Sequence, residues 1–133
     1  MIDVLTLAAV LVLAAGAAAW WRRSQGRARE AHGQLDPSAR ERLGVPHGRE
    51  LLLLFTAPTC TTCDAARAVL TDVAGRRPNL ALAEASVDDE LSLARQHGVL
   101  RAPTVLLVGA DGGVRARFAG VPAPDALGEL VDG

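Results

Sequence analysis

The hydrophobic positions of the chain fall into one long uninterrupted run followed by several short ones. The long run, Val4–Trp21, has 18 residues without a charge and is rich in Ala, Leu and Val. A helix needs about 20 apolar residues to cross the hydrocarbon core of a bilayer. Two tryptophans and two arginines at positions 20–23 close the run, and these residue types prefer the membrane interface and the headgroups. The pattern predicts a transmembrane anchor over residues 1–23.

A cleaved signal peptide is the alternative interpretation of this run. Small residues at Ala15, Ala17 and Ala19 offer cleavage positions. Signal peptides, however, begin with a positively charged segment, and the only charged side chain before the run is that of Asp3. The uncleaved anchor is therefore favoured.

The arginines after the run predict which side of the membrane the rest of the chain occupies. Arg22, Arg23, Arg27 and Arg29 follow the span, whereas no Lys or Arg precedes it. Since basic residues are retained in the cytoplasm, we expect the N-terminus outside and the domain in the cytoplasm, with the extracytoplasmic side as the alternative. Residues 24–34 are polar and have no apolar periodicity, which is typical of a juxtamembrane linker.

From residue 35 to residue 133, short apolar runs alternate with helical patterns. Strands are predicted where compact apolar runs lie between turn residues, at 50–56, 80–87, 104–108 and 114–118. Helices are predicted at 36–44 with Asp36 as N-cap, from Cys63 to Gly75, at 88–98 with an Asp88-Asp89 cap, and at 123–131. This order predicts a single α/β domain over 35–133, a mixed sheet flanked by helices.

Composition and charge exclude two classes of protein. The net charge of −1 hides seven arginines against three acids in residues 22–49, and seven arginines against eleven acids in residues 50–133. The domain therefore has no basic surface, and aromatic residues make up 3% of the chain, so no nucleic acid is expected as a partner. Two cysteines are too few for a disulfide-rich secreted scaffold.

The two cysteines carry the candidate chemistry. Cys60 and Cys63 stand where a buried strand gives way to a helix. Unpaired backbone N–H groups and the positive end of the helix dipole favour a thiolate there, and the thiolate is the form that attacks disulfides. A second cysteine three residues on lies one turn deeper on the same face. We therefore predict Cys60 as the nucleophile and Cys63 as the resolving thiol of a disulfide exchange.

Three other roles of such a pair are less favoured. A zinc site needs about four ligands, and His32, His47 and His97 form no second close-spaced pair, so we expect no metal and no cofactor. A structural disulfide that closes a two-residue loop constrains little of the unfolded chain. Inert core cysteines would be expected in the middle of a helix rather than at its start.

A second motif precedes the third predicted strand. Pro103, forty residues after Cys63, cannot donate to a sheet ladder, so it belongs at a strand entrance or a tight turn, and its peptide bond is free to be cis. Together, segments 55–63, 80–88 and 98–104, with Gly120, resemble the thioredoxin family, and the resemblance covers about residues 35–133.

The resemblance implies the thioredoxin-like fold and exchange of dithiol and disulfide with protein substrates. It implies that Pro103 is cis and faces the cysteines, and that the backbone of Ala102 pairs with an extended substrate strand. Thr59 and Thr104, which flank these two motifs, are expected beside the same substrate.

The threonines around the cysteines depart from the family pattern. Thr59 stands where the family usually has Trp, and Thr61 and Thr62 stand where it usually has Gly-Pro. Hydroxyl donors between the cysteines would stabilise a thiolate. We therefore predict that Thr61 and Thr62 tune the pair and make its disulfide more oxidising than that of ordinary thioredoxin.

The charged neighbours of the site also differ. The family's buried Asp is Leu54 here, and the position of its partner Lys aligns with Glu84. If buried, Glu84 would hold its proton more tightly and serve as general base for Cys63; the alternative is a Glu84 that faces solvent. Asp64 is expected as a solvated acid of the first helical turn, and His97 as a surface residue.

These observations predict a membrane-tethered thiol–disulfide oxidoreductase that acts on protein disulfides and is recharged by a thiol reductant. In the cytoplasm, ambient reductants would keep the pair reduced, and the protein would act as a reductase. On the other side it would need a membrane electron donor. Because the family's Trp and buried Asp are absent, a redox-inert or redox-sensing thioredoxin-like interaction module is the alternative.

Overall fold

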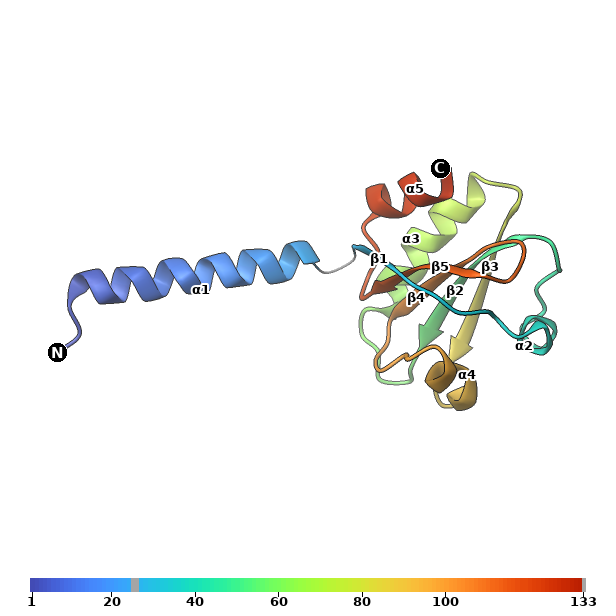
Figure 1. Cartoon of the computed structure of the whole chain (residues 1–133), viewed down its shortest axis with the longest axis horizontal. Coiled ribbons are helices and arrows are strands. Elements are labelled where there is room, and N and C mark those ends of the chain that lie inside the picture. Colours follow the sequence, from blue (N-terminus) through green and yellow to red (C-terminus); the bar gives the residue numbers. More distant parts are fainter. Residues whose placement is uncertain (25–26, 133) are drawn as a thin grey trace.

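The N-terminal apolar run forms one helix, α1 (Val4–Ser24), which extends away from the rest of the molecule in the computed structural model (Figure 1). The structure describes residues 1–24 and 27–132. The apolar part of this helix, Val4–Arg23, is long enough to cross a membrane, and none of it is buried against the remainder of the chain. A membrane span has these properties, and so does an N-terminal signal sequence.

The rest of the chain folds around one five-stranded sheet. Its strands are β1 (Ala28–Glu30), β2 (Glu50–Thr56), β3 (Leu80–Ser86), β4 (Thr104–Val108) and β5 (Val114–Ala119). They stand in the order β1-β5-β4-β2-β3. β2 and β3 are parallel, whereas the pairs β2–β4, β4–β5 and β1–β5 are antiparallel. The sheet is therefore mixed, as the sequence predicts.

Helices cover both faces of this sheet (Figure 1). They are α2 (Pro37–Arg42), α3 (Cys63–Gly75), α4 (Leu91–Gln96) and α5 (Pro124–Asp132). On β2, Leu52 and Leu54 pack with α3 and α5, while Leu51 and Leu53 pack with α2 and α4. Because this strand is buried on both faces, its apolar run is continuous rather than alternating. The predicted fold class is confirmed.

One strand lies where the sequence analysis expected a linker. β1 falls within residues 24–34 and pairs antiparallel with β5, with Ala28 opposite Phe118. Within β1, Ala28 packs partly into the core, while Arg29 and Glu30 are exposed. A three-residue edge strand with two exposed charged residues has no apolar periodicity, which explains why the pattern did not predict it.

The two predicted helix caps have different outcomes. The cap of α2 is confirmed, because the Asp36 carboxylate accepts a hydrogen bond from the Ser38 N–H at 3.0 Å. This hydrogen bond lowers the pKa of Asp36. The cap of α4 is wrong, since that helix begins at Leu91 with Glu90 as N-cap, and the two aspartates at 88–89 lie in the turn before it.

A buried arginine joins three segments of the domain. Arg40, on α2, is 3% exposed, and its guanidinium donates to the carbonyl oxygens of Pro46, Arg49 and Gly109 at 2.9, 3.0 and 3.0 Å. These carbonyls lie after α2, before β2 and after β4. The burial of Arg40 was not predicted, because an arginine in a polar six-residue helix carries no pattern that indicates burial.

Candidate active site

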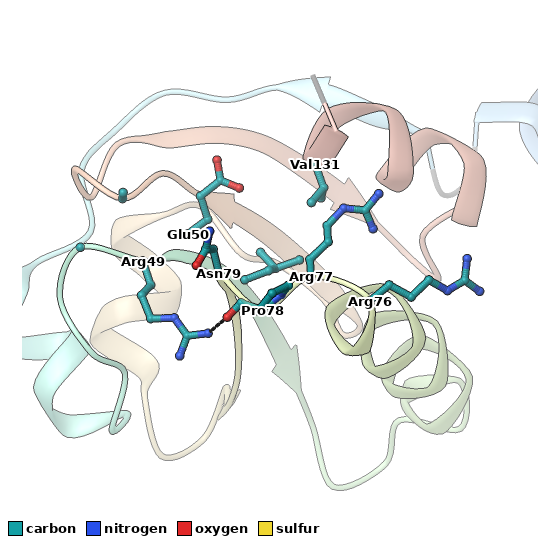
Figure 2. A pocket seen from close by; sticks show the side chains of 10 residues that line it. Arg49, Glu50, Arg76, Arg77, Pro78, Asn79 and Val131 are labelled. Carbon is teal, nitrogen blue, oxygen red and sulfur yellow. Dashed lines mark hydrogen bonds between the residues drawn. The ribbon is translucent and has the colours of Figure 1, made fainter.

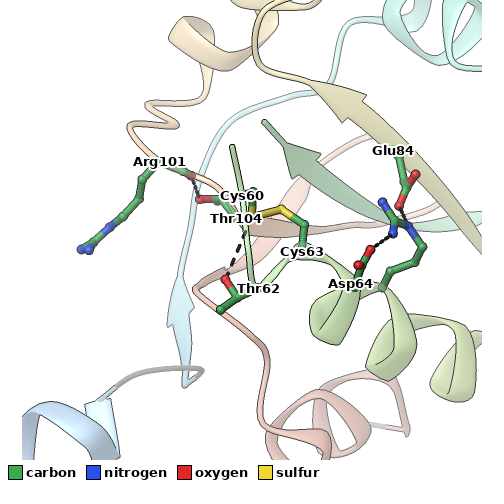
Figure 3. Close-up of a disulfide and its surroundings, with 8 residues drawn as sticks. Cys60, Thr62, Cys63, Asp64, Glu84, Arg101 and Thr104 are labelled. Atoms are coloured by element: carbon green, nitrogen blue, oxygen red, sulfur yellow. Dashed lines mark hydrogen bonds and ion pairs between the residues drawn. A yellow bond between two sulfur atoms is a disulfide. The ribbon is translucent and has the colours of Figure 1, made fainter. Parts of the chain in front are cut away.

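The two cysteines follow the C-terminal end of β2 (Figure 3). Cys60 lies in the loop before α3, where its N–H donates to the Ala57 carbonyl at 3.1 Å, and Cys63 is the first residue of α3. Their sulfurs are 2.10 Å apart and their Cα atoms 5.6 Å apart, as in a disulfide. Cys63 is 5% exposed, whereas Cys60 is more accessible. A partner in solution therefore reaches Cys60 before Cys63, which agrees with the predicted roles.

The loop before β4 lies at the same end of the sheet as the cysteine loop. The Ala102–Pro103 peptide bond is cis, as the resemblance implied, and Pro103 is buried. Thr104 is buried too, and its hydroxyl donates to the Arg101 carbonyl at 2.6 Å, which closes the loop around the proline. In the sheet, Thr104 stands opposite Phe55, next to the last residue of β2.

One of the intervening threonines is close to the accessible sulfur. Thr62 Oγ1 lies 4.0 Å from Cys60 Sγ, within reach of a weak hydrogen bond to sulfur (Figure 3). Thr59 and Thr61 are exposed. Of the two residues predicted to tune the pair, Thr62 is therefore the one whose contact with sulfur the structure describes.

Glu84 does not have the burial on which its predicted role depended. Its side chain is 40% exposed and forms an ion pair with Arg67 of α3, which also pairs with Asp64 at 2.6 Å (Figure 3). The two carboxylates raise the pKa of Arg67, and Glu84 has the larger effect. In the register of β2 and β3, Leu54 and Glu84 lie opposite each other. Arg67 was missed, because the helix residue that faces β3 depends on how α3 is rotated over the sheet.

His97 is not the surface residue that we expected. Its ring is partly buried, and its buried Nε2 atom has no hydrogen-bond partner among residues 1–24 and 27–132. Burial lowers the pKa of His97, and the charge of Arg117 lowers it further. Arg117 also donates to the His97 carbonyl at 2.7 Å. The apolar spacing around His97 gave no sign of this contact, because Arg117 lies twenty residues further along the chain.

A hollow lined by arginines lies at the opposite end of the sheet. It has a volume of about 630 Å³, and its lining includes Arg49, Arg76 and Arg77 with Pro78 and Val131 (Figure 2). These residues precede β2, follow α3 or end α5, so the seven residues of β2 separate the hollow from the cysteines. Seven residues of strand span roughly 20 Å, which is too far for a direct part in the cysteine chemistry.

Fold and site together define a class of protein. A cysteine pair where a central strand meets a helix, with a cis-proline at the same end of a mixed sheet, is the site of a thioredoxin-like thiol–disulfide oxidoreductase. The family model described as Thioredoxin matches residues 44–132. The chain belongs to the thioredoxin family, as its resemblance implied, and the matched region begins after α1 and β1.

Individual relatives agree with this assignment. A thioredoxin of Methanocaldococcus jannaschii is 32% identical over 79 residues, which cover 59% of this chain and 87% of the relative. A mutant thioredoxin from Halobacterium salinarum is 26% identical with a TM-score of 0.60, over 74% of this chain and 85% of that one. Mitochondrial thioredoxin 3 of Saccharomyces cerevisiae, in its oxidized form, is 24% identical with a TM-score of 0.59, over 71% and 86%. The last similarity supports the fold alone.

Proposed function

We propose that this protein is a membrane-tethered thiol–disulfide oxidoreductase that exchanges dithiol and disulfide with protein substrates through Cys60 and Cys63. The observation that supports disulfide exchange is that Cys60 and Cys63, whose sulfurs are at bonding distance, differ in accessibility. The tether is supported by the length and exposure of α1 and by the Trp-Trp-Arg-Arg sequence at positions 20–23.

In the reducing direction, the Cys60 thiolate attacks one sulfur of a substrate disulfide, and the other substrate sulfur leaves as a thiolate. Cys60 and the substrate are then joined by a mixed disulfide. The Cys63 thiol loses its proton and attacks Cys60 Sγ, which forms the Cys60–Cys63 disulfide and releases the second substrate sulfur. Counted from the dithiol, whose Cys60 proton is lost when the thiolate forms, the pair gives up two electrons and two protons and the substrate gains two electrons and two protons. A thiol reductant then restores the pair.

The substrate would bind across the two loops of the site. Thr59 is exposed next to Cys60, and Ala102 is half-buried before the cis peptide bond, so both are open to a partner. An extended substrate segment that pairs with the backbone of Ala102 would place its disulfide beside Cys60. In this proposal Pro103 and Thr104 fix the shape of the loop.

We place the domain on the cytoplasmic side of the membrane. The four arginines at positions 22, 23, 27 and 29 support this orientation, since no basic residue precedes the span. In the cytoplasm, glutathione and thioredoxin systems keep thiols reduced, so the pair would act as a reductase.

Insulin reduction by the full chain, with a dithiol as electron donor, tests the activity. The wild type is expected to turn over and Cys60→Ser to be inactive. Cys63→Ser is expected to accumulate a mixed disulfide with insulin, visible on gels run without reductant. A folded wild-type chain that gives no turnover would instead support a redox-sensing interaction module.

An impermeant thiol reagent applied to intact cells tests the orientation. For a cytoplasmic domain, Cys60 is expected to react after the cells are lysed and to stay unlabelled before lysis. Labelling in intact cells would place the domain on the other side of the membrane, where a membrane electron donor is required.

A further inference from the structure

The chain enters the sheet at the end where the cysteines lie. Ala28, Phe118, Val105 and Leu54 form one row across β1, β5, β4 and β2. β2 continues two residues beyond this row and leads into the Cys60 loop, whereas β1, which is antiparallel to β2, starts at the row. We call the end of the sheet that carries Cys60 and the cis-proline the catalytic end. β1 therefore begins at this same end.

The connection from the apolar helix to the catalytic end is short. The apolar part of α1 ends at Arg23 and β1 begins at Ala28, a separation of five Cα–Cα steps. Five steps span about 18 Å at most when fully extended. A domain of about 100 residues has a radius of gyration of about 13 Å and is therefore on the order of 30 Å across. With α1 in a bilayer, the tether cannot reach around the domain, so the start of β1 stays near the membrane surface.

Cys60 and the start of β1 are neighbours along the same end of the sheet, rather than lying at opposite ends of the domain. Three strand spacings separate β1 from β2 in the order β1-β5-β4-β2. At 4.7–4.9 Å each, these spacings amount to about 14 Å along the catalytic end. Cys60 therefore lies on the order of 14 Å from the start of β1, at the same end of the sheet.

The surface at the catalytic end suits contact with a bilayer. Leu100, three residues before the cis-proline, is 96% exposed, and Arg101 next to it is exposed and points away from the disulfide (Figure 3). Within residues 27–132, the other large apolar side chain that is exposed is Leu91, at 46%. A leucine beside an arginine is suited to a membrane interface, with the apolar group at the acyl boundary and the cation among the headgroups.

We propose that the catalytic end faces the bilayer and that the substrates are disulfides of membrane-bound proteins close to the bilayer surface. This inference rests on the function proposed above. The tether holds the start of β1 within about 18 Å of the headgroups, so with the catalytic end toward the bilayer a disulfide close to the membrane surface meets Cys60 directly. A large soluble protein has to enter the space between the domain and the bilayer. Position relative to the membrane then selects the substrate.

Energy transfer to headgroup acceptors shows which end faces the bilayer. The full chain is placed in liposomes with a single fluorophore. In one variant, Cys63→Ser, the fluorophore is on Cys60. In the other, Pro78→Cys with both native cysteines changed to Ser, it is on the new cysteine at position 78. Pro78 borders the arginine-lined hollow at the opposite end of the sheet. Transfer from Cys60 is expected to be several-fold more efficient. Equal or stronger transfer from position 78, or from Arg76→Cys at the same far end, would overturn the proposal.

A longer tether tests the substrate class. Twenty Gly and Ser residues inserted between Ser24 and Ala28 raise the r.m.s. reach of the tether from about 12 Å to about 27 Å. Wild type and extended variant, both in liposomes, receive either soluble insulin or a disulfide peptide linked to a lipid by a short spacer. The ratio of lipid-linked to insulin rates is expected to be about tenfold higher in the wild type. Equal ratios would overturn the proposal. No turnover of either substrate by either form, in liposomes and in detergent, would instead contradict the proposed function.

Discussion

Cys60 and Cys63 have the same side chain in different surroundings. Cys63 is nearly buried at the first residue of α3, and Cys60 is accessible in the loop before it. This difference in accessibility was predictable, because it follows from the position of each cysteine between strand and helix. The contact of Thr62 with Cys60 was not, because two adjacent threonines have the same sequence signal, and the loop conformation decides which hydroxyl reaches sulfur.

Thr62→Val should make the cysteine pair more reducing. The hydroxyl of Thr62, 4.0 Å from Cys60 Sγ, is placed to donate to the thiolate and so to stabilise the reduced form. A hydrogen bond this long is weak, so the midpoint potential should fall by about 10–20 mV, roughly 0.5–1 kcal/mol for two electrons. Redox titration against glutathione measures the change. Thr61→Val is the matched control, and an equal change in that variant would contradict the role of Thr62.

Glu84→Gln should leave the pH dependence of disulfide exchange unchanged. The Glu84 carboxylate is partly exposed and pairs with Arg67, so it is not placed as a buried proton acceptor for Cys63. pH–rate profiles of the wild type and the variant, measured with insulin, test this expectation. Loss of the alkaline or acidic limb in the variant would restore Glu84 as a general base.

At the scale of helices and strands, the burial of an element decides whether its position can be predicted from the sequence. β2 and β4 were predictable, because strands buried on both faces leave continuous apolar runs. β1 was not, because two of its three residues face solvent and its partner β5 lies almost ninety residues away. Arg40 was hidden for a related reason, since its carbonyl partners come from two loops, the one between α2 and β2 and the turn after β4, which meet only in the folded domain.

Arg40→Met should destabilise the domain strongly. Methionine fills much of the same space but donates to none of the Pro46, Arg49 and Gly109 carbonyls, of which Gly109 keeps its second donor, the Gly112 N–H. The Pro46 and Arg49 carbonyls lose this donor in a partly buried setting, and a buried group left unsatisfied costs about 1–3 kcal/mol, so we expect the free energy of unfolding to fall by about 2–4 kcal/mol. Urea denaturation of the full chain measures the loss. Arg42→Met, on the same helix and exposed in its ion pair with Glu90, should cost much less. Similar losses in both variants would refute this account.

His97 should make the domain less stable in acid. Its pKa is lowered from the ordinary 6.5 by burial and by Arg117, so the folded chain binds fewer protons at this site than the unfolded chain. The contribution of neutral His97 to the free energy of unfolding is therefore complete above about pH 6.5, and it is lost as the pH falls through the lowered pKa.

Thermal melts between about pH 7.5 and about pH 5 test the role of His97. The melting temperature of His97→Gln should fall less over this range than that of the wild type. His32→Gln removes an exposed histidine and should keep the slope of the wild type. Parallel slopes for His97→Gln and the wild type would show that another group is responsible.

At the scale of the whole molecule, the order of elements was enough to predict a mixed sheet flanked by helices, because one strand–helix–strand unit and one hairpin restrict the sheet to few arrangements. The thioredoxin-like fold itself was implied by the resemblance of the motifs. The sequence did not predict which edge of the sheet receives the N-terminal residues. That edge determines where the chain from α1 joins the domain, and the answer depends on the pairing of Ala28 with Phe118.

The helix α1 also means that the substrate concentration relevant to the reaction is a surface density rather than a concentration per volume. Once α1 is in a bilayer, enzyme and membrane-bound substrate meet by lateral diffusion, so their encounter rate depends on molecules per unit of membrane area. Adding empty lipid at constant total protein and substrate should therefore slow the reduction of a lipid-linked disulfide in fused liposomes, in proportion to the added area. Reduction of a small soluble disulfide should stay constant under the same surface dilution.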